Sequence, residues 1–250
     1  MEDALVAEAR VPENRGLSQA ERVVDTFVAP SKTFADILRS SSWWLPCVLV
    51  ILCSVVYAVT AVKTVGLSTM ADNMIQTMPK IQELMASDKT QAAAIHARFE
   101  TQLSSGFYST PISFVIGGFA IAGLFMATVN FAFGGKSNFW QAMAVFWYSL
   151  LPLAIWYLLI VVILMLGGNN DSFQAANPVG TNIGFYLADS SPAIKALFSI
   201  FDVFSIWIFG LQAYGMAKVA RISFGKAAAA VAIWWLLYSV MKVVPAMLFS

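Results

Sequence analysis

Two charged residues of this 250-residue chain lie inside long apolar stretches, where charge is costly: Asp202 and Lys242. In a helix, Asp202 would share one side with three other polar residues, Ser199, Ser205 and Gln212. An acid and a base in such surroundings can form an ion or proton path, or can neutralise each other as a structural pair. The sequence leaves both alternatives open and marks Asp202, Lys242 and Gln212 as candidate site residues.

The two charges are expected at similar depth. Asp202 lies 16 residues before Lys218, and Lys242 lies 16 residues after Lys226, on either side of a short basic turn. At a rise of about 1.5 Å per residue, both positions lie roughly 24 Å from that turn. Pairing would relieve the cost of each lone charge, which is about 2.5–3.5 kcal/mol at the centre of a membrane helix. The alternative is a lysine side chain that snorkels to the interface.

The remaining polar residues indicate structural roles. Asn130 lies near the end of an apolar stretch, where an amide is expected to hydrogen-bond across helices. His96 is the single histidine, and without a cysteine or second histidine nearby it excludes the common zinc arrangements. Cys47 and Cys53 lie six residues apart in one apolar stretch, so we expect packing roles and neither a disulfide nor a metal site.

Familiar catalytic motifs are missing from the sequence. It contains no phosphate-binding loop, no G-x-S-x-G turn and no H-E-x-x-H pair. We therefore predict no enzymatic activity and no cofactor. An intramembrane enzyme without a familiar motif is the least favoured alternative.

Five long apolar stretches carry these candidates. Hydrophobic residues make up 59% of the chain and charged residues 12%, with a mean hydropathy of +0.72, far from soluble composition. A helix needs about 20 apolar residues to cross a hydrocarbon core about 30 Å thick. The predicted fold is an all-α integral membrane bundle of five transmembrane helices. The spans are expected at about 43–65, 111–133, 142–166, 194–217 and 227–248.

The segment before the first span predicts two short amphipathic helices. Ser18 and Glu21 match a capping box, and Pro30 separates the helices. Their apolar stripes consist of Val23, Val24, Phe27 and Val28, then Phe34, Ile37 and Leu38. Such helices lie at a membrane interface or, alternatively, pack on the bundle's own loops. Residues 1–17 are expected to be a disordered tail without a cleavable signal peptide, and residues 18–250 to form one membrane domain.

The segments between the spans predict further details. Residues 66–110 are expected to form helices that cap the bundle, and Pro152 is expected to kink the third span. Two small-xxx-small pairs in the second span, Gly118 with Ala122 and Gly123 with Ala127, allow another helix to approach closely.

Lys and Arg predict the orientation, because they concentrate on the cytoplasmic side of membrane helices. A cytoplasmic N-terminus places nine of them inside: Arg10, Arg15, Arg22, Lys32, Arg39, Lys136, Lys218, Arg221 and Lys226. Four lie on the other side: Lys80, Lys89, Arg98 and Lys195. With five spans, the C-terminus is then non-cytoplasmic.

Three segments in this order resemble the Yip domain family, the Rab-GTPase-interacting membrane proteins and their bacterial relatives. They read FVAPSKTFADILRSSSWWLP before and into the first span, NFAFGGKSNFWQAMAVFWYSLLP between the second and third, and IFDVFSIWIFGLQAYGMAKVARISFGKAAAAVAIWW through the fourth into the fifth. The resemblance covers about residues 23 to 249. It implies a cytoplasmic N-terminal region, five membrane helices and, in eukaryotic members, a role in vesicle traffic. The short tail and long first loop favour the bacterial branch.

The expected function is that of a non-enzymatic membrane scaffold or trafficking-type component that binds membrane lipids and other membrane proteins. The scaffold interpretation predicts that the small-xxx-small faces contact a partner. The alternative is a small transporter or channel that uses Asp202, Gln212 and Lys242. We expect a multi-pass protein of the bacterial inner membrane and a possible homo-oligomer. A net charge of +1 offers no basic surface for nucleic acid.

Overall fold

The architecture is a bundle of long helices. The computed structural model describes residues 16–168, 171–187 and 190–248, and all regular secondary structure in these residues is helical. Five helical stretches are long and apolar enough to cross a membrane: Trp44–Thr64, Lys89–Ala132, Phe139–Met165, Val203–Ala220 and Phe224–Met247. The prediction of an all-α, five-span bundle is confirmed. The expected disordered tail, residues 1–17, lies almost entirely outside the described residues.

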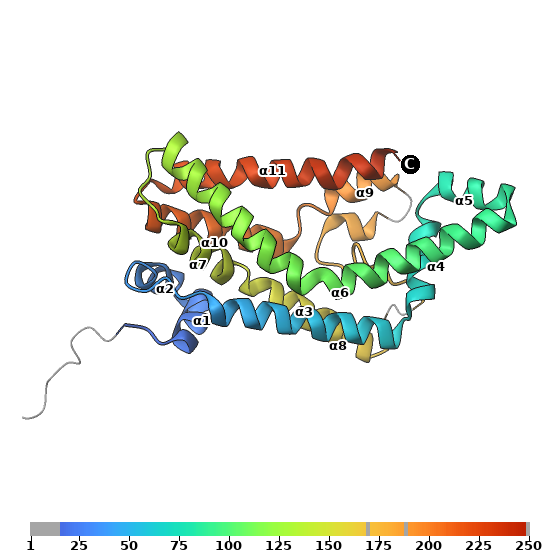
Figure 1. Cartoon of the computed structure of the whole chain (residues 1–250), viewed down its shortest axis with the longest axis horizontal. Coiled ribbons are helices and arrows are strands. Elements are labelled where there is room, and N and C mark those ends of the chain that lie inside the picture. Colours follow the sequence, from blue (N-terminus) through green and yellow to red (C-terminus); the bar gives the residue numbers. More distant parts are fainter. Residues whose placement is uncertain (1–15, 169–170, 188–189, 249–250) are drawn as a thin grey trace, which may run out of the picture.

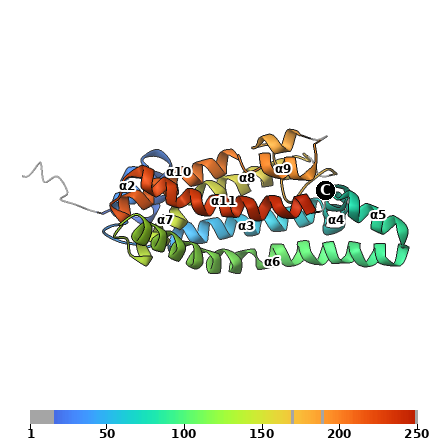
Figure 2. The same ribbon diagram turned by 90° about the horizontal axis from the view of Figure 1, so that it is seen from above.

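The long helices α3, α6, α8, α10 and α11 run roughly along one long axis (Figures 1 and 2). In chain order the first six are α1 (Gln19–Val28), α2 (Pro30–Asp36), α3 (Trp44–Thr64), α4 (Leu67–Gln76), α5 (Pro79–Ser87) and α6 (Lys89–Ala127). They are followed by the π-helix η1 (Thr128–Ala132), α7 (Phe139–Ser149), α8 (Leu151–Met165), the 3-10 helix η2 (Ile183–Tyr186), α9 (Pro192–Phe198), α10 (Val203–Ala220) and α11 (Phe224–Leu248). Helix α3 packs along α8, and α10 packs along α11.

The third span forms the centre of the bundle. About 56% of its apolar window is buried, against 22% for the second and fifth spans. Its two halves, α7 and α8, meet at Leu150, and Pro152 lies in the first turn of α8, where its missing N–H costs little. The predicted kink is therefore a break between two helices. Trp147 and Tyr148 of α7 are among the largest fully buried side chains.

Helix α6 differs from the expected second span, which was placed at 111–133. It begins at Lys89, where the Asp88 carboxylate accepts hydrogen bonds from the backbone of the first turn, and it continues through Pro111 for 39 residues. This is roughly 58 Å at 1.5 Å per residue. The predicted loop helix and the second span are thus one helix, because a single proline removes one hydrogen bond but not the apolar packing beyond it. With α4 and α5, its first half forms a projection at one end of the bundle (Figure 1).

One of the two small-xxx-small pairs of α6, Gly118 with Ala122, packs against another helix of the same chain. Ala122 is fully buried, and a Cβ added at Gly118 would lie 3.0 Å from the Phe146 ring of α7. Glycine at this position lets α6 approach α7 closely. The face of Gly118 and Ala122 therefore contacts α7, and the expectation that it contacts a partner is wrong for this pair.

The N-terminal helices form a hairpin that packs on the bundle. The predicted capping box of Ser18 and Glu21 is present, and Pro30 begins α2. Phe34 is fully buried beside α10, where a Cβ at Gly215 would lie 2.7 Å from its ring. In contrast, Val24 is 60% exposed. Two residues of the second apolar stripe, Phe34 and Ile37, are therefore part of the bundle core, while Leu38 is 43% exposed. This agrees with the alternative of packing on the protein, although Phe34 packs on a span instead of on loops.

Candidate functional site

The fourth span is broken just before Asp202. Helix α9 ends at Phe198 and α10 begins at Val203, so the span expected at 194–217 is two helices with a non-helical link. Asp202 is the N-cap of α10: its Oδ1 accepts hydrogen bonds from the backbone N–H groups of Phe204 at 2.9 Å and Ser205 at 3.4 Å. Aspartate is among the best N-cap residues, because it satisfies N–H groups that have no partner inside the helix. Asp202 therefore begins a helix instead of lying inside one.

The second carboxylate oxygen of Asp202 binds the connection between α8 and α9. The Thr181 hydroxyl donates to Oδ2, and the Asn182 amide donates to the same atom at 3.4 Å. The backbone N–H of Val203 in turn donates to the Thr181 carbonyl at 3.2 Å. Non-helical backbone inside a membrane protein is tolerated where protein groups satisfy it. The buried Asp202 carboxylate is thus occupied by donors of its own chain.

Two asparagines extend this network, and the sequence did not single them out. Asn182 and Asn177 exchange side-chain amide hydrogen bonds at 2.8 and 3.3 Å, and the side-chain oxygen Oδ1 of Asn182 accepts from the Phe185 N–H at 3.1 Å. Only the polar composition of residues 167–191 was visible from the sequence. The available signal was the asparagine at the start of η2, since asparagine favours caps and turns.

Lys242 is near Asp202 but not in contact with it. Its side chain is half-buried on α11 and lies within electrostatic reach of the Asp202 carboxylate. Among the described residues, no ion pair within 4.0 Å joins the two. The structure therefore brings both charges to one region, where direct contact is replaced by hydrogen bonds from Thr181 and Asn182.

Gln212 lies apart from this region. It is buried on α10, ten residues or roughly 15 Å along the helix from Asp202. Among the described residues its side chain has no hydrogen bond that joins it to Asp202 or Lys242. Two further buried polar atoms, Trp147 Nε1 and Ser149 Oγ of α7, have no hydrogen-bond partner in the described chain. The three candidates of the expected path do not form one continuous polar line.

Asn130 closes the turn between the second and third spans. It lies in η1, and its side chain donates to the Ser137 carbonyl at 2.7 Å and accepts from the Ser137 N–H at 3.0 Å. The preceding residue of the turn, Lys136, donates its backbone N–H to the carbonyl of Ala220 at the end of α10 at 3.0 Å. The expected bond across helices is thus a bond within the turn, because a π-helix re-aims the amide toward the returning chain.

A buried arginine at the other end of the bundle was missed by sequence reasoning. The Arg22 side chain is 1% exposed and joins α1 to α2 through the Asp36 carboxylate, with Nε to Oδ2 at 2.6 Å. Its Nη1 also donates to the carbonyl of Ser40 at 2.8 Å, just before the first span. The Thr26 and Thr33 hydroxyls both donate to the Arg22 carbonyl. We call the group of Arg22, Asp36 and Ser40 the N-terminal latch.

The latch keeps Asp36 ionised. Burial raises the pKa of the Asp36 carboxyl, but hydrogen bonds and positive charge from Arg39 and Arg22 outweigh burial and hold that pKa below its usual value. Arg39 reaches Asp36 from the solvent side, with Nε to Oδ1 at 2.7 Å. Arg22 and Asp36 are 14 residues apart in two short helices, so only the fold of the hairpin shows that they meet.

His96 takes part in the helical projection. Its Nε2 lies 3.0 Å from Asp72 Oδ1 and so links α6 to α4. In the described part of the chain, no group of three or more His, Cys, Asp or Glu residues is arranged to hold a metal ion.

A comparison with known protein families finds a match that spans nearly all of the residues described above. The sequence model of the Yip1 domain matches residues 24–244. The chain belongs to the Yip1 domain family. The Yip1 match includes Asp36, Asn130, Asp202 and Lys242, while Arg22 lies two residues before it. No curated protein and no solved structure matches the chain. The resemblance seen in the sequence is confirmed, and this Yip1 domain protein is a multi-pass membrane protein.

Proposed function

We propose that this Yip1 domain protein is a non-enzymatic membrane scaffold that organises other membrane proteins and lipids. The observation that carries the proposal is that Asp202, the central residue of the rival transport path, is already hydrogen-bonded by its own chain. Its carboxylate caps α10 and accepts from Thr181 and Asn182. A carboxylate occupied in this way holds the fold together and offers little capacity to a passing ion.

The outer faces of the second and fifth spans are the proposed contact surfaces. Both spans are among the least buried of the five, and both expose large apolar side chains, including Ile112 and Ile116 on α6 and Leu236 and Met241 on α11. Lipid and other transmembrane helices are the partners that such faces accept, and a second copy of the chain is one such partner.

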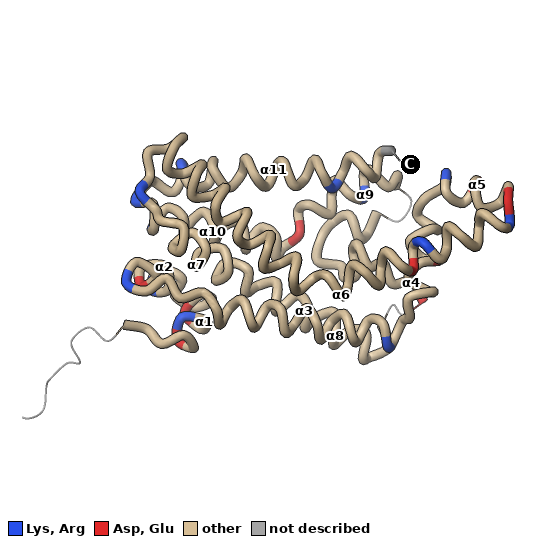
Figure 3. The backbone as a smooth tube through the Cα atoms, viewed as in Figure 1, with Lys and Arg blue, Asp and Glu red and all other residues tan. Residues whose placement is uncertain are grey.

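The proposed setting is the bacterial inner membrane with a cytoplasmic N-terminus. Charged residues gather at the two ends of the bundle, and the middle is nearly free of them (Figure 3). The hairpin of α1 and α2, the turn around Lys136 and the turn between α10 and α11 lie at one end (Figure 1). The excess of Lys and Arg in these segments supports their placement on the cytoplasmic side.

The rival function, a small transporter or channel, is favoured by Lys242 alone. This lysine lacks a direct acidic partner among the described residues and lies near a broken helix, a feature of many transporter sites. We propose instead that Lys242 and Asp202 attract each other as a structural pair across the contact between α10 and α11. Under this proposal, Lys242→Gln lowers the stability of the protein, and the ion flux across vesicles that contain the protein does not change.

Photo-crosslinking in native membranes tests the scaffold proposal. A photoreactive residue at Ile116, which is 65% exposed, should give discrete adducts with membrane proteins, and the same residue at Leu236 should do so on the second face. The matched control is Val145, which is fully buried and should give no intermolecular adduct. Lipid adducts alone at both exposed positions would contradict a protein-binding scaffold.

A further inference from the structure

A hollow lined by tryptophan lies where two spans begin. It has a volume of about 520 Å³, within the range of small-molecule sites, and is open on one side. Its lining comprises Ser41, Ser42, Trp43, Trp44, Asn138 and Trp140. The first four residues lead from the hairpin of α1 and α2 into α3, and the last two begin α7. The family assignment and the polar path above do not account for this hollow.

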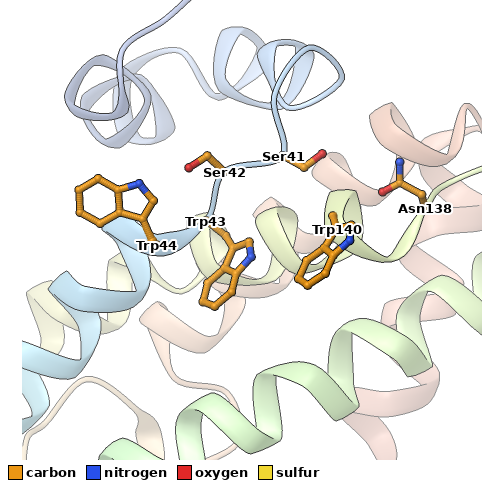
Figure 4. A pocket seen from close by; sticks show the side chains of 6 residues that line it. All are labelled: Ser41, Ser42, Trp43, Trp44, Asn138 and Trp140. Atoms are coloured by element: carbon orange, nitrogen blue, oxygen red, sulfur yellow. The ribbon is translucent and has the colours of Figure 1, made fainter.

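The side chains of the hollow combine apolar surfaces with hydrogen-bonding groups. Trp43 and Trp140 lie side by side and point the same way, with the hydroxyls of Ser41 and Ser42 on the chain above them (Figure 4). Trp44 borders one edge and Asn138 the opposite edge (Figure 4). Indole N–H groups, hydroxyls and an amide can donate to phosphate or ester oxygens, and indole faces attract ammonium groups.

The position of the hollow indicates which molecule is within reach. Trp44 is the first residue of α3 and Trp140 lies in the first turn of α7, so the hollow is at the end of the apolar spans. Tryptophans at such ends lie at the level of lipid headgroups. A lipid is already held beside the hollow by its acyl chains, so its headgroup can enter the open side without the full entropy cost of capturing a free solute.

The charge of the lining selects among lipids. None of the six lining residues carries a formal charge, and the neighbouring Arg39 is paired with Asp36. An anionic headgroup would find no cation in the lining to pair with. A zwitterionic headgroup brings its own ammonium, which fits the indole faces, and its own phosphate, which fits the N–H and O–H donors.

We propose that this hollow binds the headgroup of a zwitterionic phospholipid, with an ammonium group and a phosphodiester. Trp140 supplies an aromatic face, and the Ser42 hydroxyl supplies a donor to the phosphate. The Ser41 hydroxyl lines the hollow but already donates to the Ile37 carbonyl at 3.3 Å. Trp43 also forms the floor, because it stacks on the buried Trp147 with ring centroids 6.3 Å apart. The inference deepens the lipid part of the proposed function, and its test can fail while protein partners are still captured at Ile116.

The test compares lipids retained by the full chain. The protein is reconstituted in vesicles of equal parts phosphatidylethanolamine and phosphatidylglycerol with identical acyl chains, extracted in mild detergent and examined by native mass spectrometry. We expect retained phosphatidylethanolamine in excess over phosphatidylglycerol. Trp140→Leu should lower this retention about two- to fivefold, the fold-change that corresponds to one cation–π contact at an exposed ring.

Two further variants keep the test decisive. Ser42→Phe fills the hollow without removing a packed aromatic side chain and should lower retention similarly. Trp207→Leu is the matched control: Trp207 is partly exposed on α10, does not line the hollow, and its replacement should leave retention unchanged. Melting temperatures like that of Trp207→Leu show that the variants fold. Equal retention of both lipids by the unmodified protein, or unchanged retention in Trp140→Leu and Ser42→Phe, would overturn the proposal.

Discussion

At the scale of single residues, Asp202 stabilises a break that the hydrocarbon would otherwise penalise. Four residues between α9 and α10 leave the helix, and the N–H groups at the start of α10 need partners. The Asp202 carboxylate supplies them on one oxygen and holds Thr181 and Asn182 on the other. One side chain thus closes a helix end and fastens the preceding connection.

Two substitutions at Asp202 separate its cap from its charge. Asp202→Ala should lower the free energy of unfolding by about 1–3 kcal/mol, because it loses the cap and leaves the donors of Thr181 and Asn182 unpaired. Asp202→Asn should cost less, since asparagine is an equally good cap. Reversible unfolding in mixed micelles measures both. Equal losses would show that the negative charge, not the cap, is what matters.

For Ser149 we predict a substitution that raises stability instead of lowering it. Its hydroxyl is buried in α7 without a hydrogen-bond partner in the described chain, so Ser149→Ala removes an unsatisfied polar group and should raise stability by about 1 kcal/mol. The control is Ser239→Ala on α11, whose hydroxyl donates to the Trp235 carbonyl at 2.7 Å. This control should be neutral or destabilising. A loss of stability in Ser149→Ala would reveal a bound water or ligand at that hydroxyl.

At the scale of elements, the N-terminal latch explains why two short helices hold one position. Helix α2 has seven residues and α1 ten, too few for stable isolated helices in water. The buried Phe34 and the pairing of Arg22 with Asp36 supply the tertiary contacts that order them. The hairpin thus depends on the bundle more than on its own propensity.

Breaking the latch should release the hairpin. Arg22→Ala leaves Asp36 paired only with the exposed Arg39, and we expect a loss of about 3 kcal/mol, the lower end for a broken buried ion pair. A spin label at the exposed Val24 should become more mobile. Lys32→Ala, a change at an exposed residue of α2, is the control and should leave mobility unchanged. Unchanged mobility in Arg22→Ala would mean that Phe34 alone anchors the hairpin.

The latch also predicts a response to acid. The folded pKa of Asp36 lies below its unfolded value, so its contribution to stability is present above the unfolded value of about 3.9. That contribution is lost as pH falls through the lower folded pKa. Between pH 8 and 5 the label at Val24 should report a constant hairpin, with release only below about pH 4. Release between pH 7 and 6 would implicate another group.

At the scale of the whole molecule, a five-span topology predicts that the two ends of the chain lie on opposite sides of the membrane. Helices α1 and α2 lie at one end of the bundle, and α11 ends at the other, beside the projection of α4, α5 and α6 (Figure 1). Lys and Arg concentrate around the first of these ends. We propose that this charge difference selects which end faces the cytoplasm.

Reporter fusions test this orientation. A fusion at Arg10 should report the cytoplasm, and a fusion at Ser250 should report the opposite side, because the positive charges near the spans resist translocation. Both fusion points lie outside the described residues. A reporter inserted after Ser87 in the projection should agree with the one at Ser250. Agreement between Arg10 and Ser250 would be incompatible with five spans.

The sequence alone determined the features that follow from local pattern. The apolar stretches predicted five spans, and the first, expected at about 43–65, was placed within one residue of α3 (Trp44–Thr64), because Trp43 and Trp44 mark the start of a long apolar stretch. The capping box at Ser18 was likewise visible, since a cap needs only residues three apart in the chain. Composition and short-range spacing suffice where hydrophobicity and local hydrogen bonds decide the outcome.

Tertiary structure decided whatever depends on contacts between distant segments. The break before Asp202 appears only when Thr181 and Asn182 come within hydrogen-bonding reach of it, because a carboxylate in an apolar stretch fits a continuous helix equally well. The continuity of α6 through Pro111 depends on its packing against α7 and α4. The meeting of Arg22 with Asp36 required the folded hairpin. In each case the competing local structures differ little in energy, and burial and hydrogen bonds from elsewhere in the chain select one of them.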